Sequence, residues 1–391
     1  MTLISDTAAL EAFCQRQRKA DFIAVDTEFL RDNTYWPQLC LVQVGGPDEV
    51  AAIDTLAGID LQPLVDLLND ESVLKVFHAG RQDLEIFFHL TGRLPHPIFD
   101  TQVAAMVCGF GDQVGYDTLA RKLVGARIDK ASRFADWSKR PLTERQLEYA
   151  LADVIHLRPI YEKLSRKLEK SGRAGWLAEE MAVLTHPDTY KLTPELAWRR
   201  LKTKSSNRRY LAVLRALAAW RETEAQRRDI PRNRVLRDEQ LQDIAAHRPT
   251  SVKELARTRG LGRDFAGGRT GASLLAAIEA AMALPESELP EPRQREETPL
   301  GLGPLVELLK VLLKMKSEEH DVAHRLIASS ADLEAIAADD NADVPALSGW
   351  RREIFGEDAL ALKHGKLAMT AQGTRVELVP LTASQSFTAT G

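Results

Sequence analysis

Asp26 and Glu28 are the first side chains in the sequence whose types and spacing could do chemistry. They follow the β-rich run 22–26 and are two residues apart, so in an extended chain both carboxylates project from the same face. Two carboxylates on one face suit a divalent cation. The same spacing also occurs at solvated strand ends without function, and Asp83-Leu-Glu85 repeats it here, so the pair alone is only a candidate.

A third acid, Asp83, comes soon after the expected buried strand 73–78 and the turn Ala79-Gly80. Open α/β sheets carry their active sites at the carboxyl ends of strands, which favours a functional role. An aspartate in the first turn of a helix also complements the helix dipole and caps free amides, and this is the commoner reason for its presence. Position alone leaves both interpretations open.

The last candidates lie on a helix that should begin after Thr143, because Thr143-Glu-Arg-Gln146 has the capping-box pattern. Tyr149 and Asp153 are four residues apart and therefore share one face of this helix. A helical tyrosine more often packs than reacts, so the pair is weak by itself. Four acids and a phenol brought together from separate elements are a stronger signal, because clustered like charges repel unless cations are present.

An all-oxygen set of ligands favours Mg²⁺ or Mn²⁺ over zinc. Two such ions roughly 3.5 to 4 Å apart can activate a water molecule and stabilise the leaving oxygen in phosphodiester hydrolysis. We therefore expect a site for two divalent metal ions.

The chain that must position these residues has 391 residues, 44% hydrophobic and 28% charged, as in a globular protein of two or three domains. Its formal charge of −4 neither favours nor excludes a nucleic-acid partner. Three widely spaced cysteines fit a reducing compartment. With no signal peptide and no long apolar run, the sequence predicts a cytoplasmic protein that contacts no membrane, and it indicates no obligate protein partner.

The expected elements divide the chain into an α/β part and a helical part. Closely spaced strands at 22–26, 39–44 and 50–54 predict an antiparallel meander, and the strand 73–78 between two helices adds a βαβ unit. The strand signal disappears from about Pro194. We expect a mixed α/β domain at 1–195, a helical domain at 196–284, an exposed linker at 285–299, a second helical domain at 300–370 and a frayed polar tail at 371–391.

The motifs resemble those of ribonuclease D, one of the DEDD exonucleases of the tyrosine subclass. The order Asp, Glu, Asp, Tyr-x-x-x-Asp carries the resemblance, and the helical part resembles two HRDC domains. The matching segments are Asp26–Arg31, Phe77–Glu85, Ser132–Trp137, Arg140–Thr143 and Tyr149–Asp153 in the first domain, and 230–235, 248–255, 260–262, 349–352 and 355–358 in the helical part.

The resemblance implies an α/β ribonuclease H-like exonuclease domain, with a mixed sheet flanked by helices, followed by two small all-α HRDC-type domains. It implies hydrolysis of RNA from the 3′ end with release of nucleoside 5′-monophosphates, and precursor tRNA as substrate. Asp26 would bridge both ions, Glu28 and Asp153 would complete the first site, and Asp83 would hold the second ion directly or through water. Tyr149 would orient the attacking water, since a phenol pKa near 10 is too high for a free base.

Local charge supports a nucleic-acid substrate, because residues 199–237 contain 13 Lys or Arg against 3 Asp or Glu, and residues 121–140 contain 7 against 2. Tyr35, Trp36 and Trp137 could stack on bases of a single strand, although basic runs are also common on solvated helices. The expected RNA contacts are Gln43, His78, Arg133, Trp137, Arg208 and Arg209. A DNA exonuclease and a catalytically silent RNA-binding module remain the alternatives.

Overall fold

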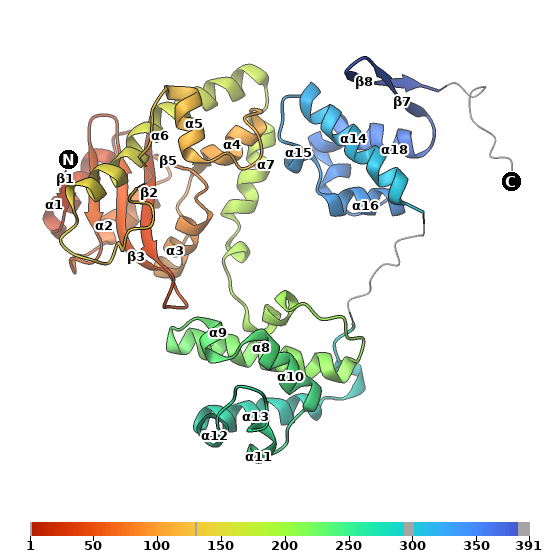
Figure 1. Ribbon diagram of the computed structural model, residues 1–391. Helices are drawn as coiled ribbons and strands as arrows, with labels where there is room; N and C mark the ends of the chain where they lie inside the picture. The colour runs from red at the N-terminus through yellow and green to blue at the C-terminus, as the bar shows by residue number, and fades with distance from the viewer. Residues whose placement is uncertain (1, 130, 293–300, 382–391) are drawn as a thin grey trace.

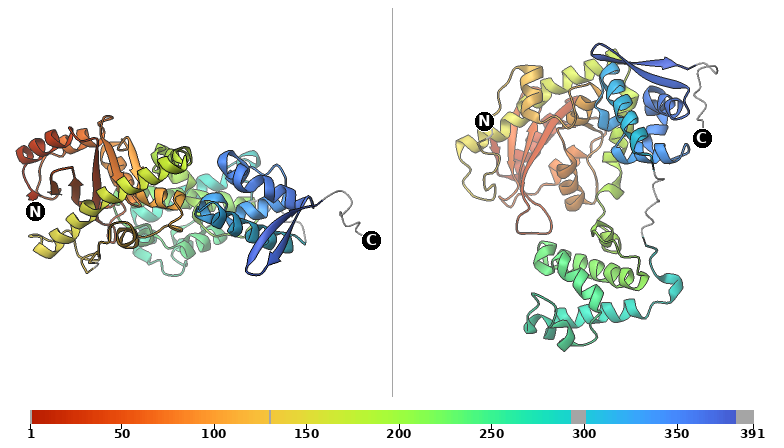
Figure 2. Two further views of the ribbon diagram at one scale, coloured as in Figure 1. Left: turned by 90° about the horizontal axis from the view of Figure 1, so that it is seen from above. Right: turned by 45° about the vertical axis from the view of Figure 1, so that its right-hand side comes forward.

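The computed structural model describes residues 2–129, 131–292 and 301–381, which form three bodies (Figure 1). The amino-terminal domain contains the large sheet. The first helical module, residues 208–292, lies on the side of that domain where strands β2 and β3 are joined. The second helical module, residues 301–381, lies beside helix α7 (Figures 1 and 2). None of the helices in these residues has the length and apolar character needed to cross a membrane.

The amino-terminal domain is built on a six-stranded mixed sheet with the order β1-β4-β3-β2-β5-β6. Its centre is the expected antiparallel meander, which is confirmed, and β5 lies parallel to β2. The two three-residue edge strands were not predicted. The strands are β1 (Thr2–Ile4), β2 (Phe22–Leu30), β3 (Gln38–Gly45), β4 (Val50–Asp54), β5 (Leu74–Phe77) and β6 (Ile98–Asp100).

Helices cover both faces of this sheet, because the strands alternate apolar side chains between them. Ile23 and Val25 of β2 pack with the helices α1, α2 and α3. Ala24, between them, packs on the other face against Val154 and Leu157 of the long helix α6. The helices are α1 (Thr7–Gln17), α2 (Gln62–Leu68), α3 (Arg81–Thr91), α4 (Thr101–Val107), α5 (Tyr116–Val124), α6 (Glu144–Ser171) and α7 (Ala174–Thr185).

Both helical modules have compact apolar cores of their own. A 3₁₀ segment at Pro194–Arg200 precedes the first module. Its helices are α8 (Arg208–Arg228), α9 (Arg232–Val235), α10 (Asp238–His247), α11 (Val252–Leu255), α12 (Arg263–Gly267) and α13 (Arg269–Met282). Those of the second are α14 (Gly303–Glu319), α15 (His324–Ile327), α16 (Ser330–Ala338), α17 (Gly349–Arg351) and α18 (Glu357–Lys363).

The structure corrects two expectations at the ends of the modules. The first part of the predicted linker, residues 285–292, packs on its module, since Leu289 is buried and its carbonyl accepts a hydrogen bond from Arg208 at 2.9 Å. The rest of that linker, residues 293–299, lies outside the described residues.

The frayed tail is the second correction, because the second module is not all-helical. Residues Leu367–Gln372 (β7) and Arg375–Pro380 (β8) form an antiparallel hairpin, and Met369 and Leu378 pack on the module's core. Gly373, at φ +62°, makes the turn without strain. Each strand is only six residues long and none of its side chains is fully buried, so the sequence carries only a weak strand signal here. Residues 382–391 of the predicted tail are outside the described part of the chain.

Candidate active site

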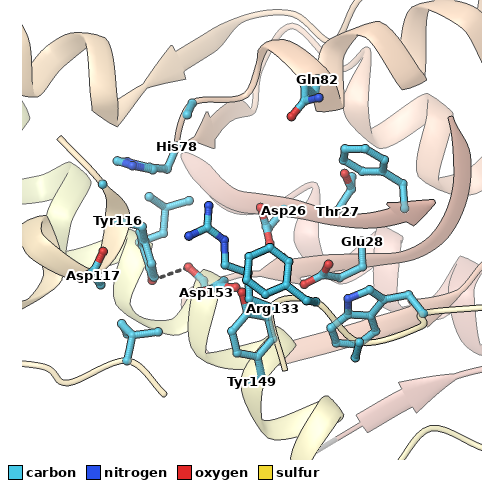
Figure 3. A pocket seen from close by; sticks show the side chains of 18 of the residues that line it. Asp26, Thr27, Glu28, His78, Gln82, Tyr116, Asp117, Arg133, Tyr149 and Asp153 are labelled. Atoms are coloured by element: carbon cyan, nitrogen blue, oxygen red, sulfur yellow. Dashed lines mark hydrogen bonds between the residues drawn. The ribbon is translucent and has the colours of Figure 1, made fainter. Parts of the chain in front are cut away.

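Three acids meet between strand β2 and helix α6 (Figure 3). Asp26 and Glu28 continue the face of β2 that begins with Ala24, and this face turns toward α6. Asp153 reaches them from α6, so that one carboxylate oxygen from each of the three residues lies within 4.8 Å of the other two. The strand continues through the pair to Leu30 rather than ending there, so the acids are held by a paired strand.

Helix α6 is fixed in place by local chemistry. Thr143 caps it, with the reciprocal hydrogen bonds to Gln146 that the sequence predicts. The hydroxyl of Tyr116 on α5 donates hydrogen bonds to the carbonyl oxygens of Ala152 and Asp153 (Figure 3). Tyr116 was not predicted to take part, because nothing in its sequence context distinguishes it. These contacts fix the position of the α6 backbone at Asp153 relative to β2.

The pKa values of all three acids are raised, as expected for carboxylates placed to bind a cation. Burial and the neighbouring charges of Asp153, Asp83 and Glu28 raise the pKa of Asp26 well above its ordinary value. Burial and the charges of Asp153 and Asp83 raise the pKa of Glu28 to about 9. Burial raises the pKa of Asp153 to about 7, against a lowering hydrogen bond from Tyr149. Three oxygen ligands and no nitrogen or sulfur fit a hard divalent cation.

Asp83 lies beside this cluster and not in it. Thr27, between the two acids of β2, points to the opposite face, and its hydroxyl donates a hydrogen bond to Asp83 on α3. Burial raises the pKa of Asp83 to about 6, while the Thr27 hydrogen bond lowers it. Its charge still raises the pKa of Asp26 and Glu28. The structure therefore gathers three of the four predicted acids directly, with the fourth as a close neighbour.

Tyr149 lies one turn before Asp153 on α6 and is partly buried. Burial, followed by the charges of Asp153, Glu28 and Asp26, raises its pKa further above the ordinary phenol value. A phenol with such a pKa keeps its proton at neutral pH and acts as a hydrogen-bond donor. Its position suits the predicted orienting role better than that of a general base.

A cavity of about 700 Å³ opens beside the acids. Its wall includes His78, Arg133 and the exposed ring of Phe134, together with Arg31 and Asp32 after β2. Burial lowers the pKa of His78, which keeps the ring neutral at pH 7. Phe134 is 90% exposed, with the Arg133 guanidinium 5.5 Å from its ring centre. Sequence reasoning overlooked Phe134, although its place in a basic segment before Trp137 was a usable signal.

The structure places only part of the predicted RNA contacts at this cavity. His78 and Arg133 line it. Trp137 lines it too but is 2% exposed, so it offers no free stacking face. Gln43 is fully buried, across the β2–β3 ladder from Asp26. Gln43 and Trp137 are covered by neighbouring side chains, so their predicted contacts with RNA stay predictions without an exposed face to support them.

The predicted phosphate contacts of Arg208 and Arg209 on α8 also stay predictions, and both side chains have partners within their own module. Arg208 donates to the carbonyl of Leu289, and Arg209 donates to that of Leu284 at 2.7 Å. Both guanidinium groups therefore hold the end of their own module. Tyr35 is buried at the contact between the amino-terminal domain and the first module. The ring of Trp36 stacks on that of His89, with 3.8 Å between the ring centres. Neither ring therefore offers bases the free face that was expected.

The chain is similar to known proteins over nearly its whole length. Residues 1–169 match a family model described as 3′–5′ exonuclease, and residues 210–278 match the HRDC domain. Ribonuclease D of Granulibacter bethesdensis is 55% identical over 97% of this chain and 96% of its own, and that of Acidiphilium cryptum is 53% identical over 97% of each. The crystal structure of Escherichia coli RNase D, an exoribonuclease involved in structured RNA processing, superposes with a TM-score of 0.80 at 35% identity, covering 93% of this chain and 98% of that one.

Proposed function

Since the chain belongs to the ribonuclease D family and is a metal-dependent 3′–5′ exoribonuclease, we propose that it works by two-metal-ion hydrolysis at Asp26, Glu28 and Asp153. The observation that carries the proposal is the meeting of these three carboxylates, each with a raised pKa, in the wall of one cavity. Such a cluster is costly unless divalent cations neutralise it.

Each of the four acidic side chains would have a metal-binding role set by its position. Asp26 would be shared by both ions, while Glu28 and Asp153 would complete the first site. Asp83, held by its hydrogen bond from Thr27, would hold the second ion directly or through water. Bound Mg²⁺ or Mn²⁺ would supply the Lewis acidity that activates water and stabilises the leaving oxygen.

The remaining cavity residues bind and orient. Tyr149 would donate its hydroxyl hydrogen bond to the attacking water or the scissile phosphate. Arg133 and neutral His78 would contact the terminal nucleotide from the facing wall. Exposed Phe134 at the cavity gives the terminal base a surface to stack on.

For the physiological substrate we propose the 3′ trailers of precursor tRNA, leaving nucleoside 5′-monophosphates as products. The description of the E. coli relative, as involved in structured RNA processing, supports a folded RNA. The excess of basic residues at 199–237 supports contact with an RNA body.

The test is a time course on a 5′-labelled RNA with a single-stranded 3′ tail beyond a stem, beside a DNA of the same sequence. We expect metal-dependent shortening from the 3′ end that pauses near the stem and stops in EDTA. Equal or faster cutting of the DNA would favour a DNA exonuclease. Binding without cutting in any metal would mean a silent RNA-binding module.

A further inference from the structure

The two helical modules contact the amino-terminal domain through the same short element. In each, a long helix is followed by an aspartate in the left-handed conformation: Asp229 at φ +47°, directly after α8, and Asp321 at φ +49°, two residues after the end of α14. A one-turn helix begins three residues later, and the next full helix begins nine residues after the aspartate. We call residues 229–238 the first docking element and residues 321–330 the second.

The first docking element holds the loop between β2 and β3. The carboxylate of Asp229 accepts hydrogen bonds from the backbone amides of Tyr35 and Trp36, each at 3.0 Å. Arg234 donates to the side-chain oxygen of Asn33 at 2.5 Å. The Tyr35 hydroxyl donates to Glu222 of α8, which is 2% exposed.

That loop, residues 31–37, is part of the cavity wall. It continues directly from the strand that carries Asp26 and Glu28, and its first residues, Arg31 and Asp32, line the cavity. Arg31 also pairs with Glu85 of α3 at 2.8 Å. The loop is thus clamped between α3 and the first docking element.

The second docking element makes comparable contacts at a different place. Asp321 accepts from Lys167 of α6 at 3.1 Å, and the amide of Ala323 donates to the carbonyl of Met106 at 2.9 Å. His324 lies 2.9 Å from the carboxylate of Asp112. Lys167, Met106 and Asp112 are not among the residues that line the catalytic cavity.

We infer that the first helical module is a working part of the catalytic site, with Asp229 as its positioning residue. By holding the Tyr35 and Trp36 amides, Asp229 fixes the cavity wall at Arg31 and Asp32 and the end of the metal-binding strand. The second module uses the same element only to attach itself. The inference rests on the proposed exonuclease reaction at this cavity.

A matched pair of variants in the full chain tests it. Asp229→Gly and Asp321→Gly each remove one carboxylate, and glycine adopts the left-handed conformation without strain. The substrate is a single-stranded RNA tetranucleotide, which has no folded body for a module to bind. We expect Asp229→Gly to lower kcat at least tenfold with KM within threefold, and Asp321→Gly to stay within twofold of the unmodified chain.

Two further measurements separate positioning from loss of folding. Amide hydrogen exchange in residues 31–37 should accelerate in Asp229→Gly and stay unchanged in Asp321→Gly, with both melting curves cooperative. Asp229→Asn should restore kcat, because asparagine tolerates this backbone conformation and its amide oxygen still accepts hydrogen bonds.

The outcomes separate cleanly. Unchanged turnover of the tetranucleotide in Asp229→Gly, or equal losses in both glycine variants, would overturn the inference. If the unmodified chain cuts no RNA of any length in Mg²⁺ or Mn²⁺, the proposed function itself fails, and the inference fails with it.

Discussion

Buried acids are handled in opposite ways at two places in this molecule. At the first module's contact with the amino-terminal domain, Glu222 accepts hydrogen bonds from Tyr35 and from Arg232, the latter at 3.1 Å, with Arg200 at 3.8 Å. In the cavity, the charges acting on Asp26 and Glu28 are those of the other acids.

The difference shows what each place is for. The protein itself supplies the hydrogen bonds and positive charges around Glu222, and these offset the cost of burying its carboxylate. The cavity acids need bound cations to offset their mutual repulsion. Without metal this repulsion lowers the free energy of unfolding, and metal binding should raise it again. Neutralising one acid at each place should therefore have opposite effects on stability.

The largest expected effect is on catalysis at the cavity. Asp26→Asn keeps the shape but weakens cation binding, and we expect the rate of RNA shortening to fall about 1000-fold or more, a loss of roughly 4 kcal/mol of transition-state stabilisation. The measurement is single-turnover decay of a 3′-tailed RNA. RNA affinity in the presence of EDTA serves as the control and should not change. A rate within tenfold of the unmodified chain would remove Asp26 from the mechanism.

Next in size is the effect of metal on thermal stability. At a Mg²⁺ concentration 100-fold above its dissociation constant, binding to the folded form should add about 2.7 kcal/mol. This corresponds to a rise of about 5–10 °C in the melting temperature of a domain of this size. Calorimetry with and without Mg²⁺ measures it. The Asp26→Asn chain should show less than half of that rise, and an equal rise would place the cation elsewhere.

At the module contact, Glu222→Gln should destabilise. Gln still accepts a hydrogen bond but leaves Arg232 and Arg200 without their charged partner, which costs about 1–2 kcal/mol. Thermal unfolding should begin at lower temperature, by the same amount with and without Mg²⁺. A Mg²⁺-dependent difference would show that this contact and the metal site are one thermodynamic unit.

The smallest effect has the opposite sign. In EDTA, Asp26→Asn should be more stable than the unmodified chain by about 1 kcal/mol, because the neutral amide avoids the cost of burying a carboxyl group beside other acids, which the raised pKa of Asp26 reflects. The melting temperature should rise by about 2–4 °C. A fall would mean that the cavity acids are already compensated within the protein, as Glu222 is.

The parts of the site that follow local rules were predictable. Alternation along β2 put Asp26 and Glu28 on one face, and the capping box at Thr143 set the register that turns Asp153 toward them. The alternation also implies that Thr27 points away, but its contact with Asp83 depends on how α3 packs, which no local pattern specifies.

Long-range pairings were beyond what the sequence could show. A count of basic residues predicted RNA contacts at Arg208 and Arg209, but it could not show that both guanidinium groups hold carbonyls some seventy to eighty residues further on. Tyr35 was expected to offer a stacking face to bases. Its hydroxyl instead donates to the buried Glu222, a partner that lies far along the chain and could not be identified from the sequence. Charge runs predict where basic residues occur and not what they bind.

The metal-binding acids come from places far apart in the chain, with Asp26 and Glu28 near the start and Asp153 on α6. During synthesis, β2 leaves the ribosome long before α6 does. A growing or prematurely ended chain that lacks α6 has Asp26 and Glu28 but not Asp153, so its cluster is incomplete. On the proposed mechanism, the chain gains the ability to cut RNA only after α6 has been made and has packed on the sheet.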